Sequence, residues 1–378
     1  MHVVVLKRKQ PLKYGVLAVM LPSIILGVAV FTLINWISGA DPISTLQLIA
    51  TSFVSPIVIK DVILLTMLGY ALLVSFKAAI WNIGGEGQFF MGALATVVTI
   101  LYLLPENPPE NQAPLYMVTG LFFSVVLASL AGAAWAFIAG LIKAYAKLDE
   151  VPVTLLLNYI AYYLINYLVY YPLRGRRVYG YVRTDEIPSV YRVNIRLLIP
   201  TPEDPVTRAL VFAVQQVIYY AVWILGALLL AVLTWFILRR TRIGLYIQIH
   251  GSNLGYLAAL GIDPRKVAIS AITLSGLLVG YASAFYTLGD MFRVSYPVQE
   301  VTGGYGFLAV LVAWLSLLEF KYIPISAYIV SSLRSAGYAL QIGGLGAMEQ
   351  MLILIGVVLL FSSTLRFLTE YEVKVRFK

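Results

Sequence analysis

The sequence contains 378 residues, of which 60% are hydrophobic and only 12% are charged. Soluble globular chains carry about 25% charged residues, so this composition indicates an integral membrane protein. The absence of cysteine excludes disulfide scaffolds and thiolate chemistry, and two histidines leave little for a metal site.

Long apolar runs separated by short polar segments predict an all-α, polytopic membrane protein. A helix needs about 20 apolar residues to cross the hydrocarbon core of a bilayer, and the chain offers about ten such runs. In chain order, the predicted spans are 14–36, 62–80, 89–104, 115–138, 153–171, 210–238, 267–288, 307–318, 322–340 and 348–367. Segment 38–60, which contains two prolines, is expected to hold a short half-helix.

The distribution of Lys and Arg predicts how the chain is oriented. Cytoplasmic loops of membrane proteins are enriched in these residues, and the net charge of +9 is attributed to such loops rather than to nucleic-acid binding. Because the N-terminus, the loop 239–266 and the C-terminus are basic, both termini are predicted to be cytoplasmic. An arginine-rich insertion, 172–208, is placed outside, since the charge bias is weak for long polar segments.

Residues 1–378 are predicted to form a single transmembrane domain with a first half, 1–208, and a second half, 209–378. Each half contains a glycine-rich interruption: Trp-Asn-Ile-Gly-Gly-Glu-Gly-Gln at 81–88 and Gly-Gly-Tyr-Gly-Phe-Leu at 303–308. The two lie five predicted spans apart, which favours an inverted repeat of five plus five helices. Such paired interruptions indicate a substrate route, and the alternative is close packing of helices through small residues.

The loop 239–266 is the second informative stretch. A Gly-Ser-Asn break at 251–253 precedes a short apolar segment, 254–260, which is predicted to be a helix that ends at Gly261 and Pro264. A short, partly apolar helix outside the bilayer suits the groove of a partner protein. The alternative is an amphipathic helix that lies on the lipid surface.

Four motifs, in the same order along the chain, resemble the permease subunits of ATP-binding-cassette (ABC) importers, in the family of simple-sugar, nucleoside and branched-chain amino-acid permeases. Residues 81–88 resemble the signature Phe-Asn-Ile-Gly-x-Glu-Gly-Gln, with Trp81 in place of phenylalanine. Residues 149–159 resemble Asn-Glu-Val-x-x-Thr-x-x-Leu-Asn-Tyr, with Asp149 first, and 333–337 resemble Leu-Arg-Ser-Gly-Ala with the last two residues exchanged. The loop matches the coupling loop of that family at Thr241, Gly244, Gly251, Asn253, Ala258, Ala259, Gly261 and Ile262. The resemblance runs from about Leu64 to Phe361 and is nearest to the nucleoside and simple-sugar branch.

The resemblance implies a transport subunit that is not itself an enzyme. It implies a second permease chain, identical or related, an ABC ATPase subunit inside and a substrate-binding protein outside, with membrane lipid as a further partner and no nucleic acid. ATP would be bound by the ATPase, and this chain, which has no Gly-x-x-x-x-Gly-Lys-Ser/Thr motif, would hold no cofactor and no catalytic residue. The residues implied to couple to the ATPase are Gly251, Asn253, Ala258, Ala259 and Gly261. Gln248 departs from the family, which usually carries a basic residue there, and the insertion 172–208 is longer than usual.

The candidate substrate pathway combines aromatic and amide groups, which suit a sugar or a nucleobase better than an ion. Its predicted residues are Trp81, Asn82, Glu86, Gln88, Asn158, Gly303, Gly304 and Gly306. For Asn158 and Asn166 the alternative is a hydrogen bond between helices. The predicted docking residues for the binding protein are Arg174, Arg176, Arg177 and Arg183, since opposite charges steer encounter. The alternative for these arginines is an ordinary solvated surface.

A rival function is a secondary transporter driven by ions through Glu86 and Glu300. It would need no coupling loop, which argues against it. A channel is a third alternative, but the chain has no segment that resembles a selectivity filter. Arg334, inside an apolar run, needs an acidic partner, for which Glu319 and Glu349 are the candidates.

Overall fold

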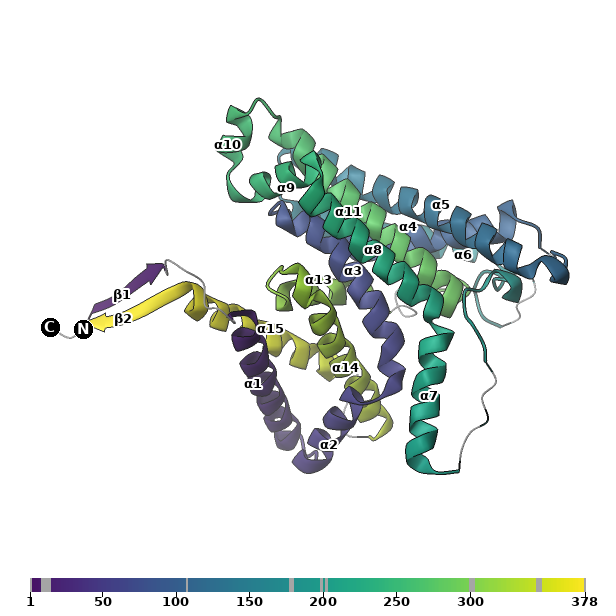
Figure 1. The fold of residues 1–378 in the computed structure, drawn as a ribbon, viewed down its shortest axis with the longest axis horizontal. Coiled ribbons are helices and arrows are strands. Elements are labelled where there is room, and N and C mark those ends of the chain that lie inside the picture. The colour runs from purple at the N-terminus through teal and green to yellow at the C-terminus, as the bar shows by residue number, and fades with distance from the viewer. Residues whose placement is uncertain are drawn as a thin grey trace. The chain divides into compact units, whose positions relative to one another are not determined.

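The computed structural model describes residues 2–7, 15–106, 108–176, 180–197, 200, 203–298, 303–344 and 349–376. The chain divides into two compact units, Ile63–Val310 and a unit that combines Met1–Val62 with Leu311–Lys378 (Figure 1). The chain passes from one unit to the other within α3 (Ile59–Lys77) and again within α13 (Tyr305–Leu315). These units interleave the two predicted halves of the sequence, and the inverted repeat stays a prediction.

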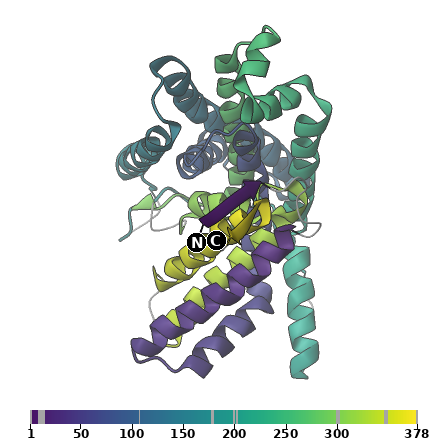
Figure 2. The same ribbon diagram turned by 90° about the vertical axis from the view of Figure 1, so that its left-hand side faces the viewer.

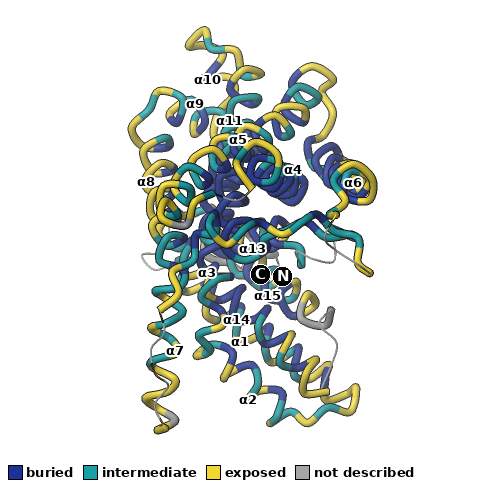
Figure 3. The backbone as a smooth tube through the Cα atoms, turned by 90° about the vertical axis from the view of Figure 1, so that its right-hand side faces the viewer, coloured by how far each residue is buried: buried dark blue, intermediate teal, exposed yellow. Residues whose placement is uncertain are grey.

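The larger unit is a bundle built around α11 (Pro264–Tyr286), which packs along α5 (Ala113–Leu141) and α4 (Gly85–Val98). The crossing of α5 and α11 is close because glycines face backbone: a methyl group at Gly280 would overlap the carbonyl of Ala128. Close backbone approach through small residues is how membrane helices gain packing energy. Figure 3 shows α4 as a buried helix of this unit, and Glu86 and Gln88 in its first turns are about 1% exposed. The described part of the unit also contains most of α3 and the helices α6 (Glu150–Tyr170), α7 (Pro205–Tyr219), α8 (Ala221–Arg240), α9 (Arg242–Ser252) and α10 (Leu254–Ala259).

The smaller unit joins the two ends of the chain. Helix α1 (Gly15–Ile37) packs along α15 (Glu349–Glu370), and α2 (Pro42–Phe53) packs along α14 (Ile323–Ile342) (Figure 2). Strands β1 (His2–Lys7) and β2 (Tyr371–Arg376) form an antiparallel pair in which His2 lies opposite Arg376. This terminal strand pair was not predicted, because neither strand has a nearby partner in the sequence.

Short 3-10 and π turns complete the described helices. The 3-10 turns are Pro56–Val58, Glu110–Gln112, Ser189–Tyr191 and Phe320–Tyr322, and the π turns are Thr99–Leu103, Ile142–Ala146 and Thr287–Met291.

The all-α, polytopic fold class is confirmed. In the described part of the chain, seven helices are long and apolar enough to cross a membrane: 15–37, 56–77, 85–103, 113–146, 150–170, 221–240 and 264–291. Three shorter apolar helices lie at 206–219, 305–315 and 352–367. The half-helix expected within 38–60 is α2, whereas the expected single span 210–238 is divided at Tyr220 into α7 and α8.

Candidate functional site

The first glycine segment, 81–88, is fixed by a closed set of amide hydrogen bonds. Asn82 Nδ2 donates to Gln88 Oε1 at 3.0 Å, and Gln88 Nε2 donates to Asn82 Oδ1 at 2.9 Å. Asn82 also donates to Ser275 Oγ on α11 at 3.1 Å and accepts from the Gly84 N–H at 3.1 Å. Both donors and both acceptor positions of this side chain are therefore satisfied in the buried core, which locks the segment against α11.

The two glycine segments meet at Glu86. Its Oε2 accepts a hydrogen bond of 2.5 Å from the N–H of Gly306, and its side chain is buried. Glu86 lies in the first turn of α4 and Gly306 in the first turn of α13. Because helix N-termini carry unsatisfied N–H groups and partial positive charge, one carboxylate here serves two helix starts.

The second glycine segment reaches this contact through left-handed backbone. Gly303 and Gly304 have φ values of +58° and +73°, which glycine adopts at little cost. A methyl group at Gly306 would overlap the backbone of Glu86. Glu300, named in the rival function, lies outside the described residues.

Asn158 and Trp81 attach the first segment to α6 and its neighbours. Asn158 Oδ1 accepts from the Gly87 N–H at 2.8 Å, and Asn158 Nδ2 donates to the Ile83 carbonyl at 3.0 Å. These are the contacts expected if Asn158 links helices. The Trp81 N–H donates to Glu150 Oε1 at 3.1 Å, and the other oxygen of Glu150 pairs with Lys143. The structure thus brings Trp81, Asn82, Glu86, Gln88, Asn158 and Gly306 together in a polar network made of several hydrogen-bonded groups, and their role in a route stays a prediction.

The short helix predicted in the loop 239–266 is present as α10. Asn253 caps it by accepting from the Tyr256 N–H at 3.0 Å, and Gly261, with φ of +75°, follows its end. Only Leu257 is buried, whereas Leu254 and Tyr256 are 52% and 55% exposed. Ala258 and Ala259 are exposed too. The helix therefore presents an apolar surface that nothing in its own chain covers within the described residues.

Helix α9, which leads into α10, is anchored to the end of α3. His250 Nδ1 lies 2.8 Å from the Ala78 carbonyl, and Gly251 packs so closely on the Lys77 carbonyl that a methyl group would overlap it. Gln248, where the sequence departs from the family, donates to the Leu238 carbonyl at 2.5 Å and so fixes α9 against α8. Burial lowers the pKa of His250, although the Ala78 carbonyl opposes this effect.

The lowered pKa of His250 gives a pH dependence of stability. Its folded pKa lies below the unfolded value of about 6.5, so the unfolded chain binds more protons as the pH falls. Stability contributed by neutral His250 is present above about pH 6.5 and is lost below it. We expect His250→Gln to lose less thermal stability than wild type between about pH 8 and about pH 5, measured as Tm in detergent. Equal losses of Tm in the two proteins would contradict this prediction. Lys143 and Glu150, the charged groups that also act on the pKa of His250, are the same in both proteins.

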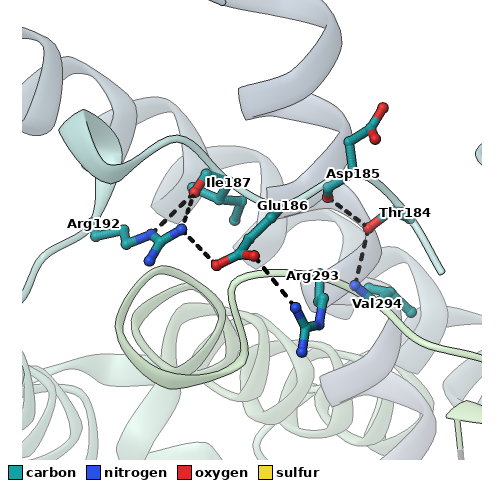
Figure 4. A network of polar contacts seen from close by, with 7 residues as sticks. All are labelled: Thr184, Asp185, Glu186, Ile187, Arg192, Arg293 and Val294. Atoms are coloured by element: carbon teal, nitrogen blue, oxygen red, sulfur yellow. Dashed lines mark hydrogen bonds and ion pairs between the residues drawn. The ribbon is translucent and has the colours of Figure 1, made fainter. Parts of the chain in front are cut away.

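Residues 182–193 of the insertion form backbone hydrogen bonds with residues 288–296, the segment that follows α11. The Ile187 N–H donates to the Phe292 carbonyl at 2.8 Å, and the Thr184 N–H donates to the Val294 carbonyl at 2.9 Å. Figure 4 shows that Glu186 accepts from Arg192 of its own segment at 2.7 Å and from Arg293 of the other segment at 3.3 Å. The ion pair between Glu186 and Arg293 was not predicted, because its partners are more than a hundred residues apart in the sequence.

An open cleft of about 510 Å³ lies beside this pairing. It is lined by Leu101, Tyr102, Glu106, Pro172, Arg174, Arg176, Asp185, Glu186 and Pro188. Of the predicted docking residues, Arg174 and Arg176 are exposed in this cleft. Arg183 is half-buried and pairs through its backbone with Ser295, and Arg177 lies outside the described residues. The cleft carries both signs of charge, so the surface is more mixed than the sequence suggested.

Arg334 has a partner that the sequence analysis did not name. Its guanidinium donates to Asp61 Oδ2 at 2.7 Å, and both side chains are 8% exposed. Asp61 lies in the first turn of α3, within the smaller unit. The pair was missed because α14 and the start of α3 are brought together only by the fold.

Comparisons with known proteins agree with the motifs. A family model described as a branched-chain amino acid transport system permease component matches residues 55–363. The guanosine ABC transporter permease protein NupP of Bacillus subtilis is 27% identical over 91% of this chain and 92% of its own length. The glucose ABC transporter permease protein TsgB13 of Haloferax volcanii is 25% identical over 97% of this chain and 91% of its own. The nucleoside ABC transporter permease protein NupB of Lactococcus lactis is 24% identical over 67% of this chain and 63% of its own length. No solved structure matches the chain.

Proposed function

Because the chain belongs to the family of branched-chain amino acid transport system permease components, within its ABC permeases for nucleosides and simple sugars, we propose that it is the membrane subunit of an importer driven by ATP. The observation that carries this proposal is the capped, exposed helix α10. An apolar helix face outside the spans suits the groove of a partner. The partner is an ABC ATPase that binds the ATP. The residues of this chain that would contact it are Gly251, Asn253, Ala258, Ala259 and Gly261.

The proposed substrate is a nucleoside or a simple sugar. The relatives named above act on guanosine, nucleosides and glucose, which are uncharged solutes. The polar network around Asn82, Glu86 and Gln88 is compatible with such a route, and the carboxylate of Glu86 within it accepts from the Gly306 N–H. That contact also weakens the rival ion-driven carrier, which needs Glu86 to bind and release an ion.

The test is affinity purification of the full chain from its native membrane in mild detergent, followed by an ATPase assay. We expect an ATPase subunit to copurify, and we expect guanosine or glucose, with the external binding protein, to stimulate it. The decisive contrary result is a chain that purifies alone and takes up these solutes into liposomes without ATP. That outcome would establish a carrier and remove the role proposed for α10.

The importer also needs an orientation and further partners. We propose that both termini and α10 face the cytoplasm, and that the insertion faces outward to a substrate-binding protein. A second permease, a copy of this chain or a relative, completes the path. The acidic surface of the binding protein would meet Arg174 and Arg176 at the rim of the cleft, since opposite patches steer association.

This docking geometry gives a prediction for charge reversal. We expect Arg174→Glu to weaken binding of the substrate-binding protein about fivefold at low salt, with a smaller effect at high salt because ions screen exposed charges. The matched control is Arg196→Glu, which makes the same charge change on the same insertion outside the cleft. Affinity is measured with the complex in nanodiscs. Equal losses in the two variants would contradict docking at the cleft.

A further inference from the structure

The backbone that follows the end of α3 is hydrogen-bonded to His250, a residue from a distant part of the chain. The Ala78 and Ile80 N–H groups both donate to the Ser75 carbonyl, at 3.0 and 3.1 Å, and Ala79 takes the left-handed φ of +54°. The last carbonyls of a helix have no partner within it. At Ala78 the partner is His250, 172 residues later on α9.

The contact between α9 and α3 is rigid on both sides. A carbonyl only accepts, so His250 Nδ1 carries the proton, as befits a neutral imidazole with a lowered pKa. Next to it, Gly251 leaves no space for a methyl group against the Lys77 carbonyl. A displacement of α9 toward α3 must therefore move the backbone at 77–78, whereas a displacement away from α3 pulls on that backbone through the His250 hydrogen bond.

The same helix is joined directly to α10. The Asn253 N–H donates to the Ile249 carbonyl at 2.7 Å, while the Asn253 side chain caps α10. No flexible linker separates the exposed helix from His250. On the other side, Ala78 is three residues from Trp81, whose N–H is held by Glu150.

We propose that His250 is the positioning residue through which movement of α10 reaches the glycine segment 81–88. The inference rests on the proposed function, because it takes α10 as the surface that an ATPase displaces. His250 touches neither ATP nor substrate. It donates to the Ala78 carbonyl and so links α9 to the start of the polar network that ends at Glu86 and Gly306.

The test compares three variants in the complete complex, reconstituted in proteoliposomes. His250→Ala removes the donor, and His250→Gln keeps an N–H that can reach the carbonyl. Ser252→Ala is the matched control, because in the part of the chain that the structure describes the Ser252 hydroxyl donates to the Ile249 carbonyl of its own helix. ATP hydrolysis and uptake of guanosine and of glucose are measured in the same vesicles.

We expect His250→Ala to hydrolyse ATP within about twofold of wild type while uptake falls about tenfold, a coupling loss of ordinary size. His250→Gln should recover most of the uptake, and Ser252→Ala should behave as wild type. Hydrogen exchange of peptides covering 78–88 gives a readout independent of substrate. Their exchange should change on adding ATP to the wild-type complex and should not change in His250→Ala.

Two results would overturn the inference while leaving the importer intact: uptake and hydrolysis both unchanged in His250→Ala, or an equal loss of hydrolysis and uptake, which indicates a damaged assembly. A wild-type complex that contains no ATPase would instead overturn the proposed function, and the coupling role of His250 with it.

Discussion

Replacing Asp61 with alanine should destabilise the protein by about 3–5 kcal/mol, because it breaks a buried ion pair by removing the carboxylate that accepts from Arg334. The two side chains are 2.7 Å apart and each is 8% exposed. The hydroxyl of Tyr338 also accepts from Arg334 at 3.0 Å, and its ring lies 5.2 Å from the guanidinium. The measurement is equilibrium unfolding of the full chain in mixed micelles.

The control for this prediction replaces both partners. Asp61→Leu combined with Arg334→Met removes both charges and fills the space with apolar side chains, which is often neutral or stabilising for a buried pair. We expect the double variant to unfold close to wild type and the single variant far below it. A double variant as unstable as Asp61→Ala would show that the pair acts through packing rather than charge.

The local part of this fold was predictable from the sequence. Apolar runs of spanning length indicated the main helices, and Asn253 with Gly261 indicated where α10 begins and ends. Both signals are local: one depends on hydropathy and the other on capping. The break between α7 and α8 at Tyr220 was missed, because no Gly or Pro lies at 219–221 to mark a helix end.

The contacts between distant segments were not predictable from one sequence. Both glycine segments could be found, but nothing in them indicated that Glu86 would accept from Gly306, 220 residues later. Likewise, Arg334 signalled the need for a carboxylate but not which one. A charge in an apolar run requires a partner, and only the packing of helices decides its identity. The polar network therefore had to come from the structure.

Gly306→Ala should reduce uptake at least about tenfold and destabilise the chain by about 1–3 kcal/mol, the usual cost of overpacking. A methyl group there would overlap the backbone of Glu86 and lie 2.7 Å from Glu86 Oε2. The starts of α4 and α13 would have to separate, and the hydrogen bond between them would lengthen or break. The measurements are ATP-dependent uptake in proteoliposomes and unfolding in mixed micelles.

The control is Gly356→Ala on α15, where a methyl group would meet nothing within 4 Å. Since alanine is about 1 kcal/mol better than glycine inside a helix, this change should be neutral or stabilising. If the two variants behave alike, the role of Gly306 is not to allow close contact between the glycine segments.

Glu86→Gln distinguishes the proposed importer from the rival ion-driven carrier. Its amide oxygen can still accept from the Gly306 N–H, so ATP-driven uptake should persist in an importer, whereas an ion-driven carrier would lose its titratable group and with it all uptake.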